Sequence, residues 1–299
     1  MTGPDRQPTL AILTYVDDHP GVIEEFSWLH KSWIHSGAWR TSDIVAVCHP
    51  GASGKLPNEP GVVKILRDPV CAPGTAWEGY PYINSIACLH GEHTAHLPQQ
   101  YSHVLRTDCD VFLTRHIVDF RPEVFVFGRG HYIQNQTVRD RIAEFAGRHG
   151  LVHQGVFNCG NSLMAKSAET LAVIQGQTLI CDWLLEAFRD DPGQWPGWCK
   201  NVLTMYAAEL AINHQLGEHV RFAFGGLLDF EPFREDEIDA ARIPHIHAFP
   251  TEEFWSKARF RRGEYADREI SAQAPGKVNA YCHWIASTPI ERIREAREV

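Results

Sequence analysis

The sequence contains no long hydrophobic run. No stretch of about 18 apolar residues, the length that a membrane-spanning helix needs, occurs anywhere in its 299 residues. The first ten residues, MTGPDRQPTL, are polar and carry no apolar segment of signal-peptide length. We therefore expect no membrane partner and a cytoplasmic location.

The chain also lacks a basic cluster and closely paired cysteines. Lys and Arg number 28 against 37 Asp and Glu, a formal net charge of −9, so nucleic acid is not an expected partner. The eight cysteines are scattered without any C-x-x-C spacing, which favours a reduced protein with mostly buried thiols. An anionic ligand would bind against the overall negative charge, which favours a bound cation or a few focused basic side chains.

What the chain does contain is a series of apolar segments of strand length, with helical patterns between them. The expected strands of the first half are residues 9–16, 43–49, 61–67 and 102–108, and the expected helices are 21–37 and 82–90. This alternation predicts an α/β fold with a central, mostly parallel sheet flanked by helices. The second half is less regular. Its expected strands are 123–128, 155–165 and 243–249, and its expected helices are 167–190, 199–217 and 291–299.

The most informative segment is HVLRTDCDVFLT, residues 103–114. In an extended chain, side chains two residues apart point the same way, so Asp108 and Asp110 converge at the carboxyl end of an expected strand, the edge where open α/β sheets bind ligands. Two adjacent carboxylates repel unless a cation or a shared proton lies between them. A hard divalent ion such as Mn²⁺ or Mg²⁺ fits, and it could neutralise a departing diphosphate. The alternative is a surface turn with two solvated acids.

This segment resembles the D-x-D motif of GT-A glycosyltransferases, which transfer a sugar from a nucleotide-sugar donor. Together with WEGYPYINSI before it, the pattern is most similar to a little-characterised family of GT-A-like proteins. The resemblance covers about residues 9–260. It implies one GT-A-like domain over residues 1–299, with a smaller second sheet. The donor-binding half would span about 9–115 and the acceptor-side half about 116–285.

Three further segments extend the resemblance and imply roles. LTYVDD resembles the strand edge that cradles the nucleoside, which implies Thr14 and Tyr15 near base and ribose. GVFNCGNSLMAKS resembles the F-N-x-G strand of the glycogenin and lipopolysaccharide-galactosyltransferase relatives, which implies Asn158 and Gly160 in the sugar pocket. YAAELAIN resembles a segment of retaining enzymes, which implies Glu209 near the donor sugar and favours retention of the anomeric configuration.

The late segment HIHAFPTEEFWSK resembles the one in which a histidine completes the metal shell and a lysine reaches the diphosphate. It implies His247 as the third metal ligand beside the two aspartates, and Lys257 as a phosphate contact. The relatives usually continue with x-G-x-x-K-P-W, whereas Phe249 and Pro250 stand near the glycine position here. His245, on the same strand face, is therefore an alternative ligand, and both histidines could instead be core residues.

Three other residues are candidate donor contacts. Arg106 shares a strand face with Asp108, so it either pairs with that carboxylate or binds a sugar hydroxyl or phosphate. Arg67 ends the third strand and would contact base or phosphate, unless it is a solvated loop end. Asn84 lies in the helix before the D-x-D strand, where a polar side chain either binds the donor or serves as a cap.

Glu209 and two tryptophans are the candidates for contacts with the donor sugar and the acceptor. Glu209 interrupts an apolar helix, and a buried carboxylate is costly unless it is paired. It could orient the acceptor, stabilise an oxocarbenium-like charge or act as nucleophile, and we expect it to be catalytic together with the metal-binding Asp110. The alternative is a place on the polar face of its helix. Trp195 and Trp198 would form a stacking surface for an acceptor sugar or simply pack a turn.

The expected function is a metal-dependent glycosyltransferase that moves a sugar from a nucleotide-diphosphate sugar to a soluble acceptor. The resemblance favours a UDP-sugar, with guanine as the other base, and a small molecule or a glycan as acceptor. One alternative is a nucleotide-sugar-binding protein without transfer activity. The other is a phosphatase of the haloacid-dehalogenase type, with Asp108 as nucleophile and Asp110 as general acid, although that family carries its aspartates on the first strand.

Overall fold

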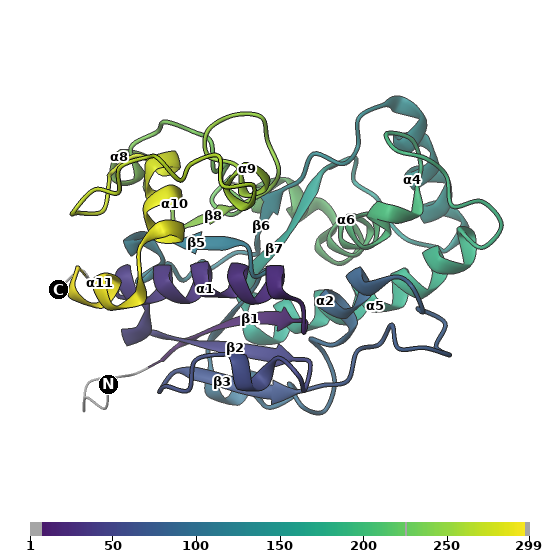
Figure 1. The fold of residues 1–299 in the computed structure, drawn as a ribbon. Coiled ribbons are helices and arrows are strands. Elements are labelled where there is room, and N and C mark those ends of the chain that lie inside the picture. Colours follow the sequence, from purple (N-terminus) through teal and green to yellow (C-terminus); the bar gives the residue numbers. More distant parts are fainter. Residues whose placement is uncertain (1–7, 225, 297–299) are drawn as a thin grey trace.

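A six-stranded sheet forms the centre of the molecule (Figure 1). The computed structural model describes residues 8–224 and 226–296. In the order in which they pair, the strands are β3 (Val62–Leu66), β2 (Ser42–Cys48), β1 (Leu10–Val16), β4 (His103–Arg106), β7 (Cys159–Lys166) and β6 (Val126–Arg129). The first four are mutually parallel, and β7 runs antiparallel to both of its neighbours. The predicted α/β class with a mostly parallel central sheet is confirmed.

A second sheet contains two short strands. β5 (Val111–Leu113) pairs antiparallel with β8 (His245–His247), and the register places Val111 opposite His247. The predicted smaller sheet is therefore confirmed. This pairing matters for the site, because β5 directly follows the two aspartates. It therefore brings the aspartates close to β8, which lies more than 130 positions later in the sequence.

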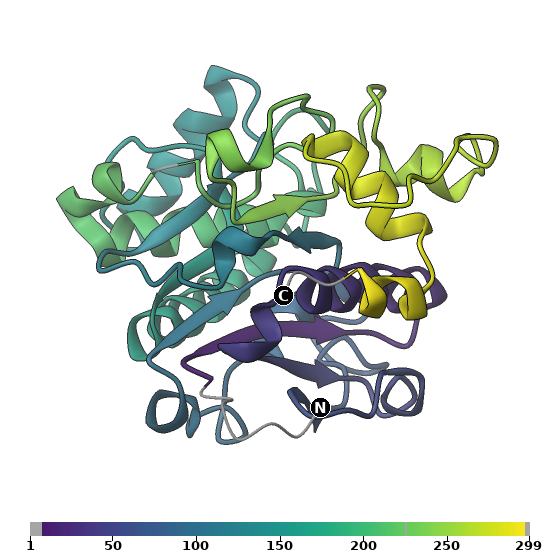
Figure 2. The ribbon, with the colours of Figure 1, turned by 90° about the vertical axis from the view of Figure 1, so that its left-hand side faces the viewer.

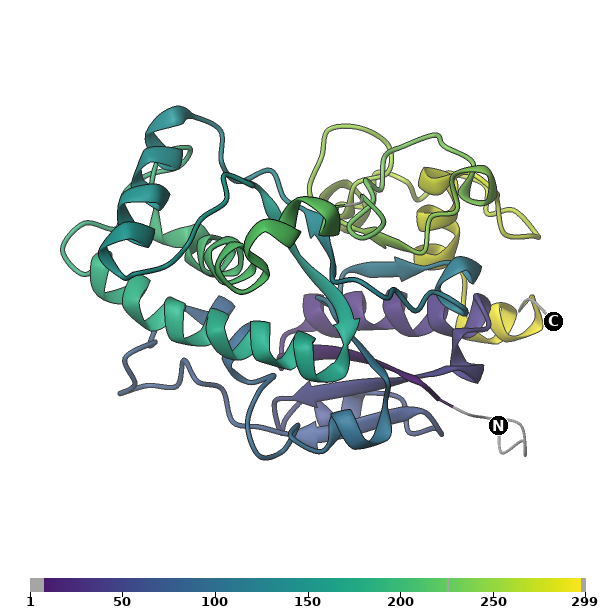
Figure 3. The ribbon, with the colours of Figure 1, turned by 180° about the vertical axis from the view of Figure 1, so that it is seen from behind.

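Helices cover both faces of the large sheet. The longer ones are α1 (Pro20–His35), α4 (Gln136–Arg148), α5 (Ser167–Ala187), α6 (Leu203–Leu216) and α10 (Val278–Ser287). The shorter ones are α2 (Asn84–Ala87), α3 (Leu97–Gln100), α7 (Val220–Ala223), α8 (Ile238–Ala241), α9 (Lys257–Arg261) and α11 (Ile290–Glu295). α1 lies in front of the sheet in Figure 1, whereas α5 and α6 come to the front in the view from behind (Figure 3). α10 and α11 contact α1, and Figure 2 shows the yellow C-terminal helices beside the purple α1.

The central strand β1 shows how the core is divided. All of its residues are buried, as expected for a parallel strand with helices on both sides. Leu10 and Ile12 belong to the hydrophobic cluster that contains α1 and α10, while Ala11 and Leu13 belong to the cluster that contains α5 and α6. Successive side chains of a strand point to opposite faces, so one strand contributes to both clusters.

The helix after β1 begins and ends at residues suited to those positions. The His19 imidazole caps α1 by accepting a hydrogen bond from the Gly21 N–H, and Pro20 occupies the first turn, where its missing N–H costs nothing. Gly37, just beyond the helix, adopts a left-handed backbone with φ of 77°, the usual way for a helix to stop. Because β1 ends at Val16 and α1 begins at Pro20, the start of α1 lies at the carboxyl edge of the sheet.

The structure also shows where the predicted elements were incomplete. The helices expected at 21–37, 167–190 and 199–217 are present, but the one expected at 82–90 is reduced to α2, which four residues form. α4 and α10 were not predicted. α4 carries a detectable signal, since Asn135 caps it and its buried residues recur with helical spacing on an otherwise polar segment. Of the expected helix at 291–299, residues 297–299 lie outside the described residues. No helix in the described part of the chain is long and apolar enough to cross a membrane.

Candidate functional site

The predicted metal ligands form a cluster at the carboxyl end of β4. Asp108, Asp110 and His247 each offer one ligand atom, and these atoms all lie within 4.8 Å of one another. The two aspartates occupy the short connection from β4 to β5, and β8 supplies His247 through its pairing with β5. A backbone hydrogen bond of 2.7 Å from Ala248 to the Asp110 carbonyl fastens the two segments together. Within residues 8–224 and 226–296 this is the one such group of His, Cys, Asp and Glu side chains.

Positive side chains already surround Asp110, which is almost fully buried. The Lys257 ammonium donates a hydrogen bond to one of its oxygens, and His247 Nε2 lies 3.3 Å from the other. Burial alone would raise the pKa of Asp110, but the charges of Lys257 and His247 hold that pKa well below its usual range. Burial would likewise lower the pKa of His247, and the carboxylates of Asp110 and Asp229 raise it well above its ordinary value. The cluster is thus built to keep a carboxylate ionised beside positive charge.

The buried side chain of Arg106 holds the Asp108 carboxylate in place by a hydrogen bond. The Arg106 guanidinium is fully buried and donates to the Asp108 carboxylate at 2.9 Å, to the Asn161 carbonyl at 2.6 Å and to the Ser85 carbonyl at 2.9 Å. Of the two roles considered for Arg106, the structure shows the pairing with Asp108. A direct contact of Arg106 with a ligand stays a prediction.

The two late histidines differ in what they contact. His245 is fully buried, its Nδ1 accepts a hydrogen bond from the Asp229 N–H at 3.0 Å, and its Nε2 lies 2.9 Å from the Thr107 hydroxyl. Burial lowers the pKa of His245 to about 4, so this ring is neutral and both nitrogens are occupied. His247 instead directs Nε2 at Asp110 and belongs to the cluster. The geometry therefore favours His247 over His245 as third ligand.

Asp229 is a functional candidate that sequence reasoning missed. Its carboxylate is buried, accepts hydrogen bonds from the Ser162 hydroxyl and backbone N–H, and lies 3.4 Å from His247 Nδ1. Burial alone would raise the pKa of Asp229, but the hydrogen bonds and charges of His247, His245 and Ser162 lower it. Its segment, GGLLDFEP, has no motif to mark it, and its partners Ser162, His245 and His247 lie 16 to 67 positions away in the sequence.

Lys257 brings a second missed acid, Glu25, to the cluster. Lys257 opens α9, and its ammonium contacts both Asp110 and Glu25 of α1, the latter at 3.3 Å. Burial and the nearby Asp110 raise the pKa of Glu25, although Lys257 and Arg261 oppose this. Sequence reasoning placed Lys257 at the site but had no signal for Glu25, which is one of two adjacent glutamates on an amphipathic helix. The expected phosphate contact of Lys257 stays a prediction.

A cavity of about 490 Å³ opens beside His247. Gly160, Asn161 and Asp229 line it next to the cluster, and aromatic side chains form much of the remaining wall. The aromatic lining residues are Tyr132, Trp195, Phe233 and Phe249. Trp195 thus faces the cavity, whereas Trp198 stacks between Phe188 and Tyr206 as an ordinary packing residue. The cavity provides a partly apolar pocket that one of the proposed metal ligands, His247, lines directly.

Glu209 and Asn158 lie behind this cavity and not among the residues that line it. The fully buried Glu209 carboxylate accepts hydrogen bonds from the Asn158 N–H at 2.6 Å and the Tyr132 hydroxyl at 3.0 Å, and contacts His153 Nε2 at 3.1 Å. Burial raises its pKa, while these partners oppose the rise. Asn158 has a left-handed backbone with φ of 62°, and its side-chain oxygen accepts from the Ile133 N–H at 2.7 Å. Glu209 therefore fixes a strained residue just before β7, and Tyr132 connects it to the cavity.

The remaining candidate donor contacts are Thr14, Tyr15, Arg67 and Asn84, and their side chains differ in whether they already have partners. The Thr14 hydroxyl is buried against Cys109 Sγ at 3.4 Å. The Asn84 side chain is also buried, and its oxygen accepts from the backbone of Val70 at 2.8 Å and of Cys71 at 3.2 Å. Both thus have structural partners. The polar groups of the other two have no such partner to give up or are open to solvent. The Tyr15 hydroxyl is buried without a hydrogen bond to any described residue, and Arg67 is exposed just beyond β3. All four contacts with a nucleotide stay predictions.

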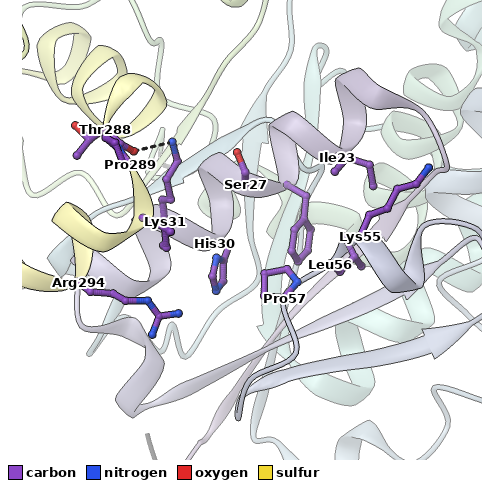
Figure 4. Close-up of a pocket in the computed structure, with 12 residues that line it drawn as sticks. Ile23, Ser27, His30, Lys31, Lys55, Leu56, Pro57, Thr288, Pro289 and Arg294 are labelled. Carbon is purple, nitrogen blue, oxygen red and sulfur yellow. Dashed lines mark hydrogen bonds between the residues drawn. The ribbon is translucent and has the colours of Figure 1, made fainter.

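A second cavity, of about 440 Å³, follows the outer face of α1 (Figure 4). Basic side chains line it, but each has a structural partner. Lys31 donates to the carbonyls of Ala286 at 2.8 Å and Thr288 at 3.2 Å, and the latter contact is drawn in Figure 4. His30 and Arg294 both contact the Glu59 carboxylate. None of the predicted site residues lines this cavity, which lies between α1 and the C-terminal segment that includes α11.

The fold and the cluster define an α/β protein with a candidate divalent-metal site at the carboxyl edge of its sheet. Residues 69–287 match a family described as "Domain of unknown function (DUF7164)", and the chain belongs to that family. A comparison with curated proteins found no match. Among solved structures, the chain is similar to 4-diphosphocytidyl-2C-methyl-D-erythritol synthase from Anaerococcus prevotii DSM 20548. The identity is 10%, the match covers 68% of this chain and 97% of that one, and the TM-score is 0.30.

Proposed function

We propose that the protein is a metal-dependent glycosyltransferase that moves a sugar from a nucleotide-diphosphate sugar, with a UDP-sugar favoured, to a soluble small-molecule or glycan acceptor. The observation that carries the proposal is the convergence of Asp108, Asp110 and His247 within 4.8 Å at the carboxyl edge of the sheet. Two carboxylates and an imidazole are a donor set that suits Mn²⁺ or Mg²⁺. The D-x-D resemblance supports the same assignment.

The side chains around the cluster have distinct tasks in this proposal. Asp108, Asp110 and His247 would hold the ion, which when bound supplies Lewis-acid stabilisation of the leaving diphosphate. Lys257, whose ammonium lies against Asp110, would bind a phosphate oxygen. Arg106 keeps Asp108 in place from the buried side. The negative net charge of the chain then does not prevent the binding of an anionic donor, because positive charge is concentrated at one point.

The cavity beside His247 would receive the transferred sugar and the acceptor. Gly160 and Asp229 line it, and Trp195, also in its lining, offers an exposed indole. The resemblance favours retention of configuration. Glu209, expected near the donor sugar, is enclosed by Asn158, Tyr132 and His153, and we propose that it positions the first two without touching the donor.

The test is calorimetric titration of UDP and GDP, each with Mn²⁺ and with EDTA, into the wild type and the Asp110→Ala variant. We expect one nucleotide to bind only with Mn²⁺, and that binding to be lost in the variant. Asp239→Ala is the matched control, since Asp239 is an exposed aspartate that also pairs with a histidine, His116. Absence of binding by both nucleotides under both conditions would overturn the proposal.

A second candidate is a nucleotide-sugar-binding protein that does not transfer the sugar. The enclosed position of Glu209 favours it, because no free carboxylate of α6 reaches the cavity. The two candidates separate in one assay: UDP release from UDP-sugars with Mn²⁺, measured against a panel of sugar and phenol acceptors. Metal-dependent binding with acceptor-stimulated UDP release supports transfer, and the same binding without release supports the second candidate.

A further inference from the structure

We propose that Asp229 is a positioning residue that holds the His247 imidazole in the tautomer and orientation required to bind a divalent ion. The proposal rests on the proposed metal site. It adds a residue outside the D-x-D motif on which the affinity of that site depends.

The two nitrogens of His247 face two different carboxylates. Nε2 lies 3.3 Å from Asp110 Oδ1, inside the cluster, and Nδ1 lies 3.4 Å from Asp229 Oδ1. The nitrogens of an imidazole point away from each other across the ring, so the partner of Nδ1 is not a ligand of an ion bound at Nε2. A carboxylate at Nδ1 keeps the proton on that nitrogen and leaves the lone pair of Nε2 for the metal. Asp229 therefore acts on the ion through His247.

The position of Asp229 is itself fixed on several sides. The Ser162 hydroxyl donates to Oδ1, and the Ser162 N–H donates to Oδ2 at 3.3 Å. The Asp229 N–H donates to His245 Nδ1 at 3.0 Å, and His245 is held in turn by Thr107. A buried carboxylate is expensive unless it is paired. Ser162 supplies its hydrogen bonds, and His247 at 3.4 Å is the nearest ionisable partner of this carboxylate.

Two glycines make room for it. A Cβ atom on Gly128 of β6 would lie 1.7 Å from Asp229 Oδ2, and a Cβ atom on Gly160 of β7 would lie 2.3 Å from the same oxygen. Asp229 also has a left-handed backbone with φ of 56°, which costs free energy for a residue other than glycine. Two neighbouring strands and a strained residue thus converge on a single carboxylate beside His247. A residue that only filled space would not need this arrangement.

The test compares Mn²⁺ affinity, by calorimetry without nucleotide, among the wild type, Asp229→Asn and the control Asp239→Asn. Asparagine keeps the shape and can keep an acceptor oxygen at the Oδ1 position, which faces both the Ser162 hydroxyl and His247 Nδ1, but it removes the negative charge that favours a proton on Nδ1. We expect the Asp229→Asn variant to bind Mn²⁺ about 10- to 100-fold more weakly, and Asp239→Asn to match the wild type. Equal affinity in wild type and Asp229→Asn, with both folded in EDTA, would overturn the proposal.

A measurement on the wild type covers the case in which the variant does not fold. Two-bond ¹H–¹⁵N correlation of the imidazoles in Mg²⁺, with His247 assigned by its loss in His247→Gln, reports which nitrogen carries the proton. We expect the proton on Nδ1 of the metal-bound protein, and a proton on Nε2 would contradict the role of Asp229. Failure of the wild type to bind Mn²⁺ or Mg²⁺ at all would instead remove the metal site itself, so the two proposals fail by different results.

Discussion

At the scale of single residues, two basic side chains each lie between two acids of the cluster. Lys257 lies between the carboxylates of Asp110 and Glu25, and His247 lies between those of Asp110 and Asp229. Two basic side chains thus face three carboxylates, with Asp110 shared between them, so the acids are only partly compensated. An ion that binds here competes with the Lys257 ammonium for Asp110.

We therefore predict that Lys257→Met lowers the free energy of unfolding in EDTA by about 3 kcal/mol, because it leaves Asp110 and Glu25 facing each other with less positive charge. Saturating Mn²⁺ should then raise the melting temperature of the variant more than that of the wild type. Urea denaturation and thermal unfolding, each with EDTA and with Mn²⁺, measure both effects.

The control for this prediction is Lys277→Met. Lys277 pairs with Glu235 at 3.4 Å on the surface, where both side chains are at least half exposed, and such pairs contribute little to stability. Its unfolding free energy should stay within about 0.5 kcal/mol of the wild type. A Lys257→Met variant as stable as this control in EDTA would show that the ammonium does not compensate the two acids.

At the scale of elements, most of the strands and three of the five longer helices could be predicted from local pattern. The buried run of β1 and the helical spacing of α1, α5 and α6 are visible in the sequence because each element shows its own period. β5 was not predicted, since three residues directly after the D-x-D motif are too few to show alternation. Its pairing with β8 is nevertheless what brings His247 to the aspartates.

The end of α10 depends on a lysine from another helix. Lys31 of α1 donates hydrogen bonds to the Ala286 carbonyl, in the last turn of α10, and to the Thr288 carbonyl just beyond it. Burial lowers the pKa of Lys31 to about 8, so its burial is costly and these two acceptors offset part of that cost. A cation at a helix C-terminus also interacts favourably with the helix dipole.

We predict that Lys31→Met lowers the unfolding free energy at pH 7 by about 1–3 kcal/mol, because two buried carbonyls lose a charged donor. Hydrogen exchange should show faster opening at the end of α10 than in β1, since the loss is local. Lys55→Met is the control: Lys55 lines the same cavity, but it is exposed and pairs with Asp18 at the surface. Equal stability of the two variants would rule out a structural role for the Lys31 contacts.

At the scale of the whole molecule, one contact joins α1 to both the loop before β3 and the last helix, α11. Glu59, from the loop before β3, contacts His30 of α1 and Arg294 of α11. The two hydrophobic clusters lie on opposite faces of one sheet and share its strands, and on this basis we propose that residues 1–299 form a single domain. Glu59 then joins the N-terminal strands to the last helix of that domain.

This junction should make stability depend on acid. Burial alone would raise the pKa of Glu59, but hydrogen bonds and charge from His30 and Arg294 lower that pKa from 4.5 to about 2. A carboxyl with a depressed folded-state pKa stabilises the protein above pH 4.5, and this contribution disappears as the pH falls to about 2. We expect Glu59→Gln to be less stable than the wild type by about 1–2 kcal/mol at pH 7, after allowance for solvent screening. The difference should shrink between pH 4.5 and 2.

Urea denaturation of both proteins over pH 2–7 measures that difference directly. Glu123→Gln is the control, because the carboxylate of Glu123 is highly exposed and contacts Lys166 only at 3.6 Å. Its difference from the wild type should stay near zero at each pH. A Glu59→Gln difference that does not change with pH would contradict the assigned contribution of the ionised carboxylate.

The sequence by itself determined the α/β class, most strands and long helices, and the convergence of Asp108 and Asp110, because periodicity and residue spacing are local properties. The resemblance to GT-A glycosyltransferases added His247 and Lys257. Only the tertiary structure decided that His247 and not His245 faces the aspartates, and that Asp229 stands behind it. These contacts join residues more than 100 positions apart or lie in an unmarked loop. They depend on the pairing of β5 with β8 and on the room left by Gly128 and Gly160, which no local pattern encodes.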